Sequence, residues 1–355
     1  MIPNKGLAWI GPNHLELISK ELRPISDSEI LIRVEVCAIC GSDLRIWKEG
    51  NSRIQSGRVI GHEIAGTVVQ TGKNVSDFKN GDRVATGADV PCGRCDFCLS
   101  GRSNCCRTNY AIGYQFDGGF ADYMIVPEIV VKNGPLHKFS DKISFELAAM
   151  AEPLACCLNG YEIAMADRLR PKIVVIFGAG PIGLLLASLA PIYGAEKVIV
   201  IDPAEQRLQF AKKLPQVTHI VSGRNAVADV LKLTDGAGAD LIFTACPDAS
   251  SHSDAIQLLA VRGVLNLFGG LPKNSPPVQL DSNFIHYREA YITGSHGSTP
   301  AQHRQALKLI ESGAIDLQNF ISKKFPLSEY AAAFDLAASQ TAMKVLITGN
   351  GVSNG

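Results

Sequence analysis

Five cysteines fall within the fifteen residues 92–106, which read CGRCDFCLSGRSNCC. Four thiolates on one loop can close a tetrahedron around Zn²⁺, and two-residue gaps let a tight turn aim neighbouring sulfurs at one point. Because adjacent side chains seldom bind the same ion, either Cys105 or Cys106 must be left out, and we take Cys106 as the ligand. The predicted zinc ligands are Cys92, Cys95, Cys98 and Cys106.

Three other interpretations of this loop are an iron–sulfur cluster, a disulfide pair and buried thiols without a metal. Ferredoxin-type spacing resembles it, but a proline normally follows the final cysteine, where this chain has Arg107. Ligand spacing therefore favours zinc. A site closed by four sulfurs has no open position for a substrate, so this zinc would be structural and the chemistry must lie elsewhere.

A second set of metal-ligand types is formed by Cys40, in CAICGSD, with His62 and Glu63, in GHE. Two or three protein ligands with a carboxylate leave room for water or substrate, which is the arrangement of a catalytic zinc. Asp43 follows Cys40 by three residues, and its carboxylate can accept a hydrogen bond from the far nitrogen of His62 and so fix the tautomer of the ring. Taken alone, a cysteine and a distant histidine are weak evidence for a metal site.

A glycine-rich turn at residues 178–183 reads GAGPIG, directly after the apolar run IVVIF and at the start of a helical pattern. Its glycines allow a tight turn and a close approach of the backbone to a pyrophosphate, while the N-terminus of the helix offers N–H donors. The predicted cofactor-binding residues of this turn are Gly178, Gly180, Pro181, Ile182 and Gly183.

Asp202 ends the next predicted strand, nineteen residues after Gly183. A carboxylate there can accept hydrogen bonds from the ribose hydroxyls and repels a 2′-phosphate, so the sequence predicts NAD⁺ rather than NADP⁺. Arg207 comes five residues later and either packs near the adenine or ribose or is a solvated helix charge.

The segment GHEIAGTVVQTGKNV fits the zinc-alcohol-dehydrogenase pattern G-H-E-x2-G-x5-G-x2-V. Together with CGSD, the four-cysteine loop and the glycine turn, it makes essentially the whole chain resemble the zinc-containing medium-chain alcohol dehydrogenases. AEPLACC resembles the polyol (sorbitol-like) branch of that family. The resemblance implies a catalytic zinc held by Cys40, His62 and a carboxylate, either Glu152 or Glu63, and the two carboxylates can exchange through a water.

The same resemblance implies hydride transfer from a secondary alcohol to NAD⁺, with zinc lowering the pKa of the hydroxyl. Ser42 occupies the proton-relay position of the family. Polyol dehydrogenases often have a histidine where this chain has Arg45, and because arginine does not deprotonate usefully, the relay must end in water or another group. Lys344 aligns with a basic position near the cofactor pyrophosphate in relatives.

Two kinds of element must position these residues. The first part of the chain has strand patterns at residues 29–37, 66–72 and 82–87 and frequent glycine and proline, as a β-rich domain requires. Later, apolar strands alternate with helical stretches, which predicts a doubly wound parallel sheet. These patterns predict an α/β protein, and the family resemblance implies a GroES-like catalytic domain (residues 1–155 and 294–355) and a Rossmann NAD-binding domain (residues 156–293).

Composition limits the partners. Lysine plus arginine equals aspartate plus glutamate at 34 each, so no net charge attracts nucleic acid or an anionic membrane. The uncharged run 173–195 has the length of a membrane span, but the glycine turn interrupts it, and a strand followed by a helix explains it better. Thiols at metal spacings and the lack of a basic-then-apolar leader predict a cytoplasmic protein.

The expected cofactors are two Zn²⁺ per chain and NAD, and resemblance favours a homotetramer. The expected substrate is a polyol, a sugar or a cyclitol, with L-threonine 3-dehydrogenase or another amino-alcohol dehydrogenase as the close alternative. A non-catalytic NAD- and zinc-binding protein is a further alternative, although it would not need a proton relay. Tyr114 and His296 are candidates to contact a substrate hydroxyl; for His296 a surface-loop role is the alternative.

Overall fold

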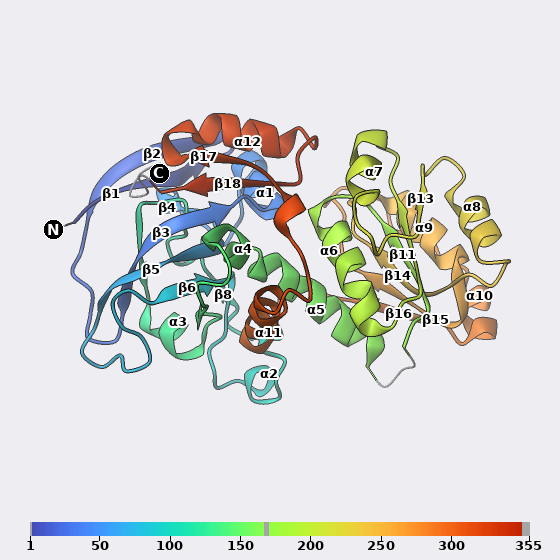
Figure 1. Ribbon diagram of the computed structural model, residues 1–355, viewed down its shortest axis with the longest axis horizontal. Helices are drawn as coiled ribbons and strands as arrows, with labels where there is room; N and C mark the ends of the chain where they lie inside the picture. The colour runs from blue at the N-terminus through green and yellow to red at the C-terminus, as the bar shows by residue number, and fades with distance from the viewer. Residues whose placement is uncertain (1, 167–169, 350–355) are drawn as a thin grey trace. The chain divides into compact units, whose positions relative to one another are not determined.

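The computed structural model describes residues 2–166 and 170–349. The chain forms two compact units. One consists of Met1–Ala155 and Gly297–Gly355 and the other of Cys156–His296, so the first unit combines the two ends of the chain (Figure 1).

The main sheet of the first unit has seven strands in the order β10-β6-β5-β3-β18-β17, and β9 also pairs with β3. Its central strand β3 (Ile30–Ala38) is antiparallel to β5 (Glu63–Thr71) and to β18 (Lys344–Thr348). The last strand of the chain is thus inserted beside one of the first. The remaining strands are β6 (Arg83–Thr86), β9 (Tyr123–Val126), β10 (His137–Lys138) and β17 (Ile321–Pro326).

Smaller elements complete the first unit. A three-stranded sheet has the order β2-β1-β4, and β7 pairs with β8. One apolar cluster packs against the main sheet and includes Ile32, Ile64, Phe120 and Phe334, the last from α12, which lies on β17 and β18. The bounds are β1 (Ile2–Gly11), β2 (His14–Leu22), β4 (Arg58–Val59), β7 (Asp89–Val90), β8 (Tyr110–Ala111), α1 (Gly41–Glu49), α2 (Asp96–Leu99), α3 (Glu128–Asn133), α4 (Phe145–Ala149), α11 (Pro300–Glu311) and α12 (Tyr330–Ala338).

The second unit is built on six parallel strands in the order β13-β12-β11-β14-β15-β16. In sequence order this is 3-2-1-4-5-6, the doubly wound arrangement in which the order reverses between the first and fourth strands. The inner strands are almost wholly apolar because helices cover them. The strands are β11 (Ile173–Phe177), β12 (Lys197–Ile201), β13 (His219–Val221), β14 (Ala239–Thr244), β15 (Leu259–Leu267) and β16 (Tyr291–Gly294).

The helices of this unit follow the predicted alternation, with one local difference. The helical pattern that follows the glycine turn forms α6 (Pro181–Leu189) and then a 3₁₀ turn, Ala190–Tyr193. Pro191 lacks the N–H that would continue the α-helical ladder, which explains the change. The other helices are α5 (Ala151–Met165), in which the first unit ends and the second begins, α7 (Glu205–Ala211), α8 (Ala226–Leu233), α9 (Ala249–Gln257) and α10 (Ser282–Arg288).

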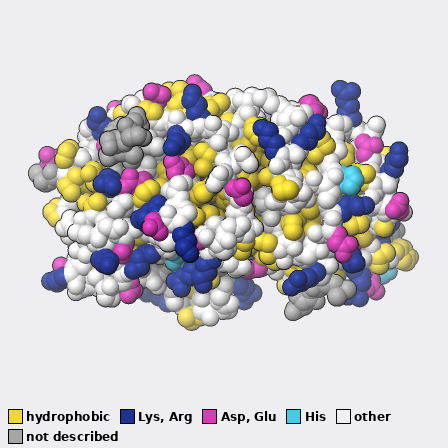
Figure 2. Space-filling model, viewed as in Figure 1, with side chains coloured by type: hydrophobic (Ala, Val, Ile, Leu, Met, Phe, Trp, Pro, Cys, Tyr) yellow, Lys and Arg dark blue, Asp and Glu magenta, His cyan; other side chains and the backbone are white. Residues whose placement is uncertain are grey.

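Charges of both signs are interspersed over the face drawn in Figure 2, in keeping with a net charge of zero. Within residues 2–166 and 170–349, no helix has both the length and the apolarity required to cross a bilayer.

Candidate active site

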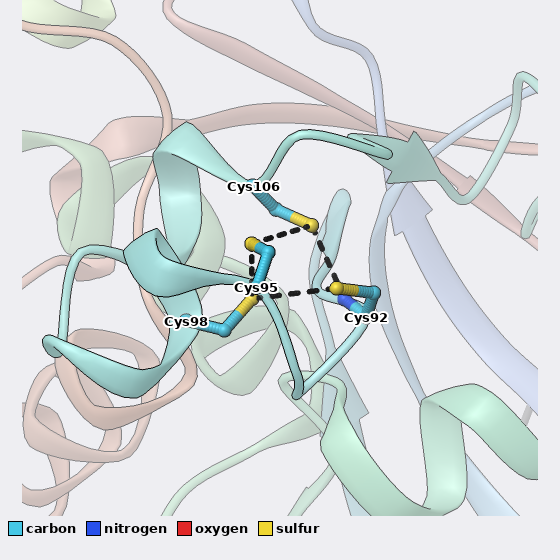
Figure 3. A group of neighbouring side chains, drawn as sticks. All are labelled: Cys92, Cys95, Cys98 and Cys106. Carbon is cyan, nitrogen blue, oxygen red and sulfur yellow. Dashed lines mark hydrogen bonds between the residues drawn. The ribbon is translucent and has the colours of Figure 1, made fainter.

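The four predicted ligands of the structural zinc lie together. Sγ of Cys95 is 3.5 Å from Sγ of Cys98 and 3.9 Å from that of Cys106, and the sulfurs of Cys92 and Cys98 are 3.9 Å apart. A regular tetrahedron with Zn–S bonds of about 2.3 Å has edges of about 3.8 Å. The four sulfurs therefore point at one centre with the spacing that zinc needs, as Figure 3 shows.

Short backbone turns hold this loop. Cys95 precedes α2 and Cys98 lies within it, while the backbone N–H of Cys92 donates to Sγ of Cys106 over 3.2 Å. Two backbone N–H groups, those of Arg94 and Cys95, lower the pKa of Cys92 to about 6, whereas burial and the neighbouring sulfurs raise the pKa of Cys98 to about 12. Without a cation the four thiols cannot all ionise, so the set suits a divalent metal.

Cys105 differs from this set, since it is exposed and stands outside the group of mutually close sulfurs. On the exposed side of the loop, Arg107 forms a bidentate ion pair with Asp96 at 2.7 Å.

The second group consists of Cys40, His62 and Glu63, whose ligand atoms lie within 4.8 Å of one another. Cys40 is the residue before α1, and the start of that helix fixes Asp43: its Oδ2 accepts from the backbone N–H of Cys40 at 2.9 Å. Oδ1 of Asp43 lies 3.3 Å from Nδ1 of His62, and the opposite ring atom, Nε2, lies 3.3 Å from Oγ of Ser42. Helix geometry thus orients the imidazole with Nε2 toward Ser42.

The charges around His62 also favour a cation. Burial lowers the pKa of His62, but Asp43 and Cys40 outweigh it and raise that pKa well above its usual value. The carboxylate of Asp43 is fully buried beside this imidazole, and Zn²⁺ or a protonated imidazole can balance its charge.

Glu63 has a strong partner of its own. It is fully buried at the start of β5, and Nζ of Lys344, at the start of β18, lies 2.5 Å from its Oε1. The same ammonium also donates to Oε2 and, over 3.3 Å, to the carbonyl of Ile39. Burial lowers the pKa of Lys344, but Glu63 raises it by more than burial lowers it. The net shift is upward, so the pair is ionic. Lys344, which was expected near the cofactor pyrophosphate, donates to Glu63 in this structure. Its role in cofactor binding stays a prediction.

Glu152 lies in the first turn of α5 and is only 6% exposed. Burial raises its pKa to about 7, with Glu63 and Asp89 adding to the rise and His62 opposing it. Among the described residues Glu152 stands outside the group formed by Cys40, His62 and Glu63. Of the two predicted carboxylates, Glu63 is thus the one grouped with the sulfur and the imidazole, and Glu152 is a buried acid of raised pKa.

The two predicted substrate residues lie in different units. The ring of Tyr114 is 6.4 Å from that of His62, and burial raises the pKa of its hydroxyl. His296 is an exposed residue that follows β16, and its carbonyl accepts from Nδ2 of Asn159 at 3.2 Å. Arg53 was not predicted as a site residue, but its guanidinium lies over the Tyr114 ring, 5.1 Å from the ring centre. Only the packing of two distant loops reveals that contact.

The glycine turn forms a cradle without side chains. Gly178 has φ +105°, a conformation that a residue with a side chain rarely adopts, and a Cβ on Gly183 would lie 1.8 Å from the carbonyl of Gly178. Gly180 precedes α6, which begins at Pro181 with Ile182 next. Backbone can thus approach a pyrophosphate at the helix N-terminus, as the predicted dinucleotide requires.

Asp202 supports this turn from behind. Its Oδ2 accepts from the N–H of Ala179 and its Oδ1 from that of Ala204, both at 2.8 Å, and Nη1 of Arg207 lies 3.8 Å from Oδ2. These contacts hold the carboxylate at the end of β12, beside the glycine turn.

Similarity to known proteins agrees with these sites. The model of the alcohol dehydrogenase GroES-like domain matches residues 26–135, and that of the zinc-binding dehydrogenase matches residues 181–312. D-Arabitol-phosphate dehydrogenase of Enterococcus avium is 33% identical over 351 residues, which cover 98% of this chain and 97% of that protein. This chain belongs to the zinc-containing medium-chain alcohol dehydrogenases. The family, the fold class and the enzymatic nature predicted for the dehydrogenase are confirmed.

Two further relatives of the dehydrogenase differ in substrate. Sorbitol dehydrogenase of Bombyx mori is 33% identical over 357 residues (98% of this chain, 99% of that one). L-Threonine 3-dehydrogenase of Caldanaerobacter subterraneus is 32% identical over 342 residues (94% of each).

Solved structures match the fold of the dehydrogenase over nearly its whole length. A zinc-binding dehydrogenase of Sinorhizobium meliloti bound to NADP has a TM-score of 0.88 at 28% identity and covers 98% of this chain and 100% of that one. An alcohol dehydrogenase of Escherichia coli with NADH has a TM-score of 0.87 at 28% identity, covering 98% and 99%. The dehydrogenase is thus a zinc-dependent enzyme that uses a nicotinamide dinucleotide.

Proposed function

We propose that this dehydrogenase oxidises a secondary alcohol of a polyol, sugar or cyclitol with NAD⁺. The observation that carries the proposal is the group of Cys40, His62 and a buried carboxylate, with the hydroxyl of Ser42 at Nε2 of the imidazole. When bound, zinc lowers the pKa of the substrate hydroxyl and NAD⁺ accepts the hydride.

The residues of the chain have distinct roles in this proposal. Cys40 and His62 hold the metal with Glu63 or Glu152, and Asp43 keeps His62 in the tautomer that frees Nε2. Oγ of Ser42 takes the proton of the substrate hydroxyl and passes it on. Arg45 is exposed, so the outer end of the relay is open to water.

The turn at residues 178–183 holds the cofactor phosphates, and Asp202 selects NAD⁺ over NADP⁺ by its negative charge. Solved relatives carry either cofactor, so this choice needs its own test. In Asp202→Ser, we expect the ratio of kcat/KM for NADP⁺ to that for NAD⁺ to rise at least about tenfold, because Arg207 then faces a 2′-phosphate without a competing carboxylate. A wild-type preference for NADP⁺ would overturn the role of Asp202.

L-Threonine oxidation is the second candidate, favoured by the 32% identity to an L-threonine 3-dehydrogenase. Balanced charge and thiols at metal spacings support a cytoplasmic location, and the family resemblance supports a homotetramer.

The test of the proposed function is zinc content per chain together with NADH formation over a panel of polyols, sugars, cyclitols and L-threonine. We expect two zinc ions and turnover in the wild type, and one zinc ion and no turnover in folded Cys40→Ser. Lys48→Gln, on the exposed side of α1, is the matched control and should behave as the wild type. Full activity in metal-stripped protein would overturn the proposal.

A further inference from the structure

We propose that Arg53 binds an anionic group on the substrate, a phosphate monoester or a carboxylate, so that the preferred substrate carries a negative charge as well as its secondary hydroxyl. This inference rests on the proposed function, because it assigns the substrate class of the same site.

The first observation is position. Arg53 belongs to the segment between α1 and β4 and is half-buried. Its guanidinium lies 5.1 Å from the centre of the Tyr114 ring, and that ring lies 6.4 Å from the ring of His62. One aromatic ring thus connects a cation to the predicted zinc ligand, a separation that an extended substrate of several carbons can bridge while its hydroxyl lies at the metal.

The second observation is charge. Within residues 2–166 and 170–349, no carboxylate forms an ion pair with Arg53, whereas Arg23, Arg58 and Arg107 each have one. Its side chain has one protein acceptor in the described part of the chain, the carbonyl of Asn109, which takes a hydrogen bond from Nη2. The N–H groups of Nε and Nη1 remain for a ligand. A partly desolvated cation without a counter-charge is costly, and the planar guanidinium matches phosphate and carboxylate oxygens.

The third observation is that the guanidinium is held in place before any ligand arrives. Asn109, which supplies the accepting carbonyl, has φ +45°, a left-handed conformation that residues with a side chain seldom adopt. The next residue, Tyr110, begins β8 and its ring packs edge-on against Phe116 at 5.6 Å. Because the Tyr114 ring and the Asn109 carbonyl already contact the guanidinium, Arg53 loses little side-chain freedom on binding an anion.

If Arg53 had a purely structural role, it would only hold the segment 51–57 against the loop 109–114. The two roles differ in the substrates that they affect. Loss of a structural contact lowers kcat/KM for every substrate alike, whereas loss of an anion site lowers it only for the charged substrates.

The experiment compares kcat/KM with NAD⁺ for matched pairs: a pentitol phosphate against the same pentitol, and L-threonine against 2,3-butanediol. In the wild type we expect one charged member to exceed its neutral counterpart by about a hundredfold, since one charge-assisted bidentate contact has that effect. Which pair shows the preference distinguishes phosphate from carboxylate. Arg53→Gln should remove about a hundredfold for the charged member and less than about threefold for the neutral one, with Arg53→Lys in between. Arg304→Gln, an exposed arginine on α11, is the control and should keep the wild-type ratios.

Binding of inorganic phosphate, measured by calorimetry with saturating NADH to block the glycine turn, tests the site without turnover. We expect its Kd to rise at least about tenfold in Arg53→Gln. Equal loss for charged and neutral substrates, or a wild-type preference for the neutral members, would overturn the anion site and leave the dehydrogenase assignment intact. Phosphate binding that depends on Arg53 in a protein that oxidises no alcohol would sink the proposed function and keep the anion site.

Discussion

At the scale of single residues, His303 is a buried histidine outside the predicted zinc ligands. It lies on α11, is 1% exposed, and neither of its ring nitrogens has a hydrogen-bond partner among the described residues. Its ring faces that of His137 at 5.3 Å, and burial, with the positive charge of a protonated His137, lowers the pKa of His303 to about 3. The folded protein therefore holds this ring neutral.

That neutrality predicts acid sensitivity. Below about pH 6.5 the unfolded chain binds a proton at residue 303, whereas the folded chain binds it only near pH 3. The free energy of unfolding therefore loses nothing from this group above pH 6.5, and it decreases as the pH falls from about 6.5 to about 3. The slope from this group is at most about 1.4 kcal/mol per pH unit. His303→Leu removes this pH-dependent loss of stability, together with two buried ring nitrogens that have no hydrogen-bond partner among the described residues. We therefore expect the Tm of this variant to fall less than that of the wild type between about pH 7 and about pH 5.

The control for this measurement is His14→Leu, which removes an exposed histidine from β2. Its Tm should follow the wild-type pH profile. Parallel profiles for His303→Leu and the wild type would show that the ring is protonated or hydrated in the folded state.

At the scale of elements, the four-cysteine loop can be tested separately from catalysis. In residues 92–106 the described structure has only the short helix α2 and a 3₁₀ turn, so metal ligation supplies most of the order. We expect Cys95→Ser to lose one zinc ion per chain and to become sensitive to proteolysis within this loop, with a lower Tm. Cys105→Ser, one residue from a ligand but exposed, should keep two zinc ions and the wild-type Tm. Loss of zinc from Cys105→Ser would mean that the ligand set is wrong.

The sequence predicts those elements that are determined by residues close together along the chain. Ligand spacing and the glycine turn act over a few residues, and the apolar run IVVIF at residues 173–177 coincides with β11. Strand partners are set by packing between distant segments, and no local pattern indicates that β18 lies beside β3. For the same reason the pairing of Lys344 with Glu63 could not be predicted, although both residues had been singled out.

At the scale of the whole molecule, the sheet of the second unit ends at β16. An edge strand presents unpaired backbone N–H and C=O groups, and this one carries the apolar Ile292, which is 38% exposed. Leu280, which is 52% exposed, lines the same pocket as Ile292. Pairing of β16 between two copies would cover this edge and build part of the proposed tetramer.

We therefore expect Ile292→Lys to shift the protein to smaller species in sedimentation velocity, because a charge on an edge strand opposes pairing. Ile192→Thr, which changes another exposed apolar residue of the same unit, should leave the distribution as in the wild type. An unchanged oligomer in Ile292→Lys would place the interface elsewhere.

The ion pair of Glu63 with Lys344 has a consequence for biosynthesis. The two residues are separated by 281 positions, and Lys344 enters only with the final strand of the main sheet. At about 5–20 residues per second, a ribosome takes tens of seconds to travel from one to the other. Throughout that time the nascent chain carries an acid without its counter-charge beside the cysteine and the imidazole. Burial of Glu63 as an ion pair must then wait until translation is nearly complete, and a chain truncated before residue 344 would leave this acid without its counter-charge.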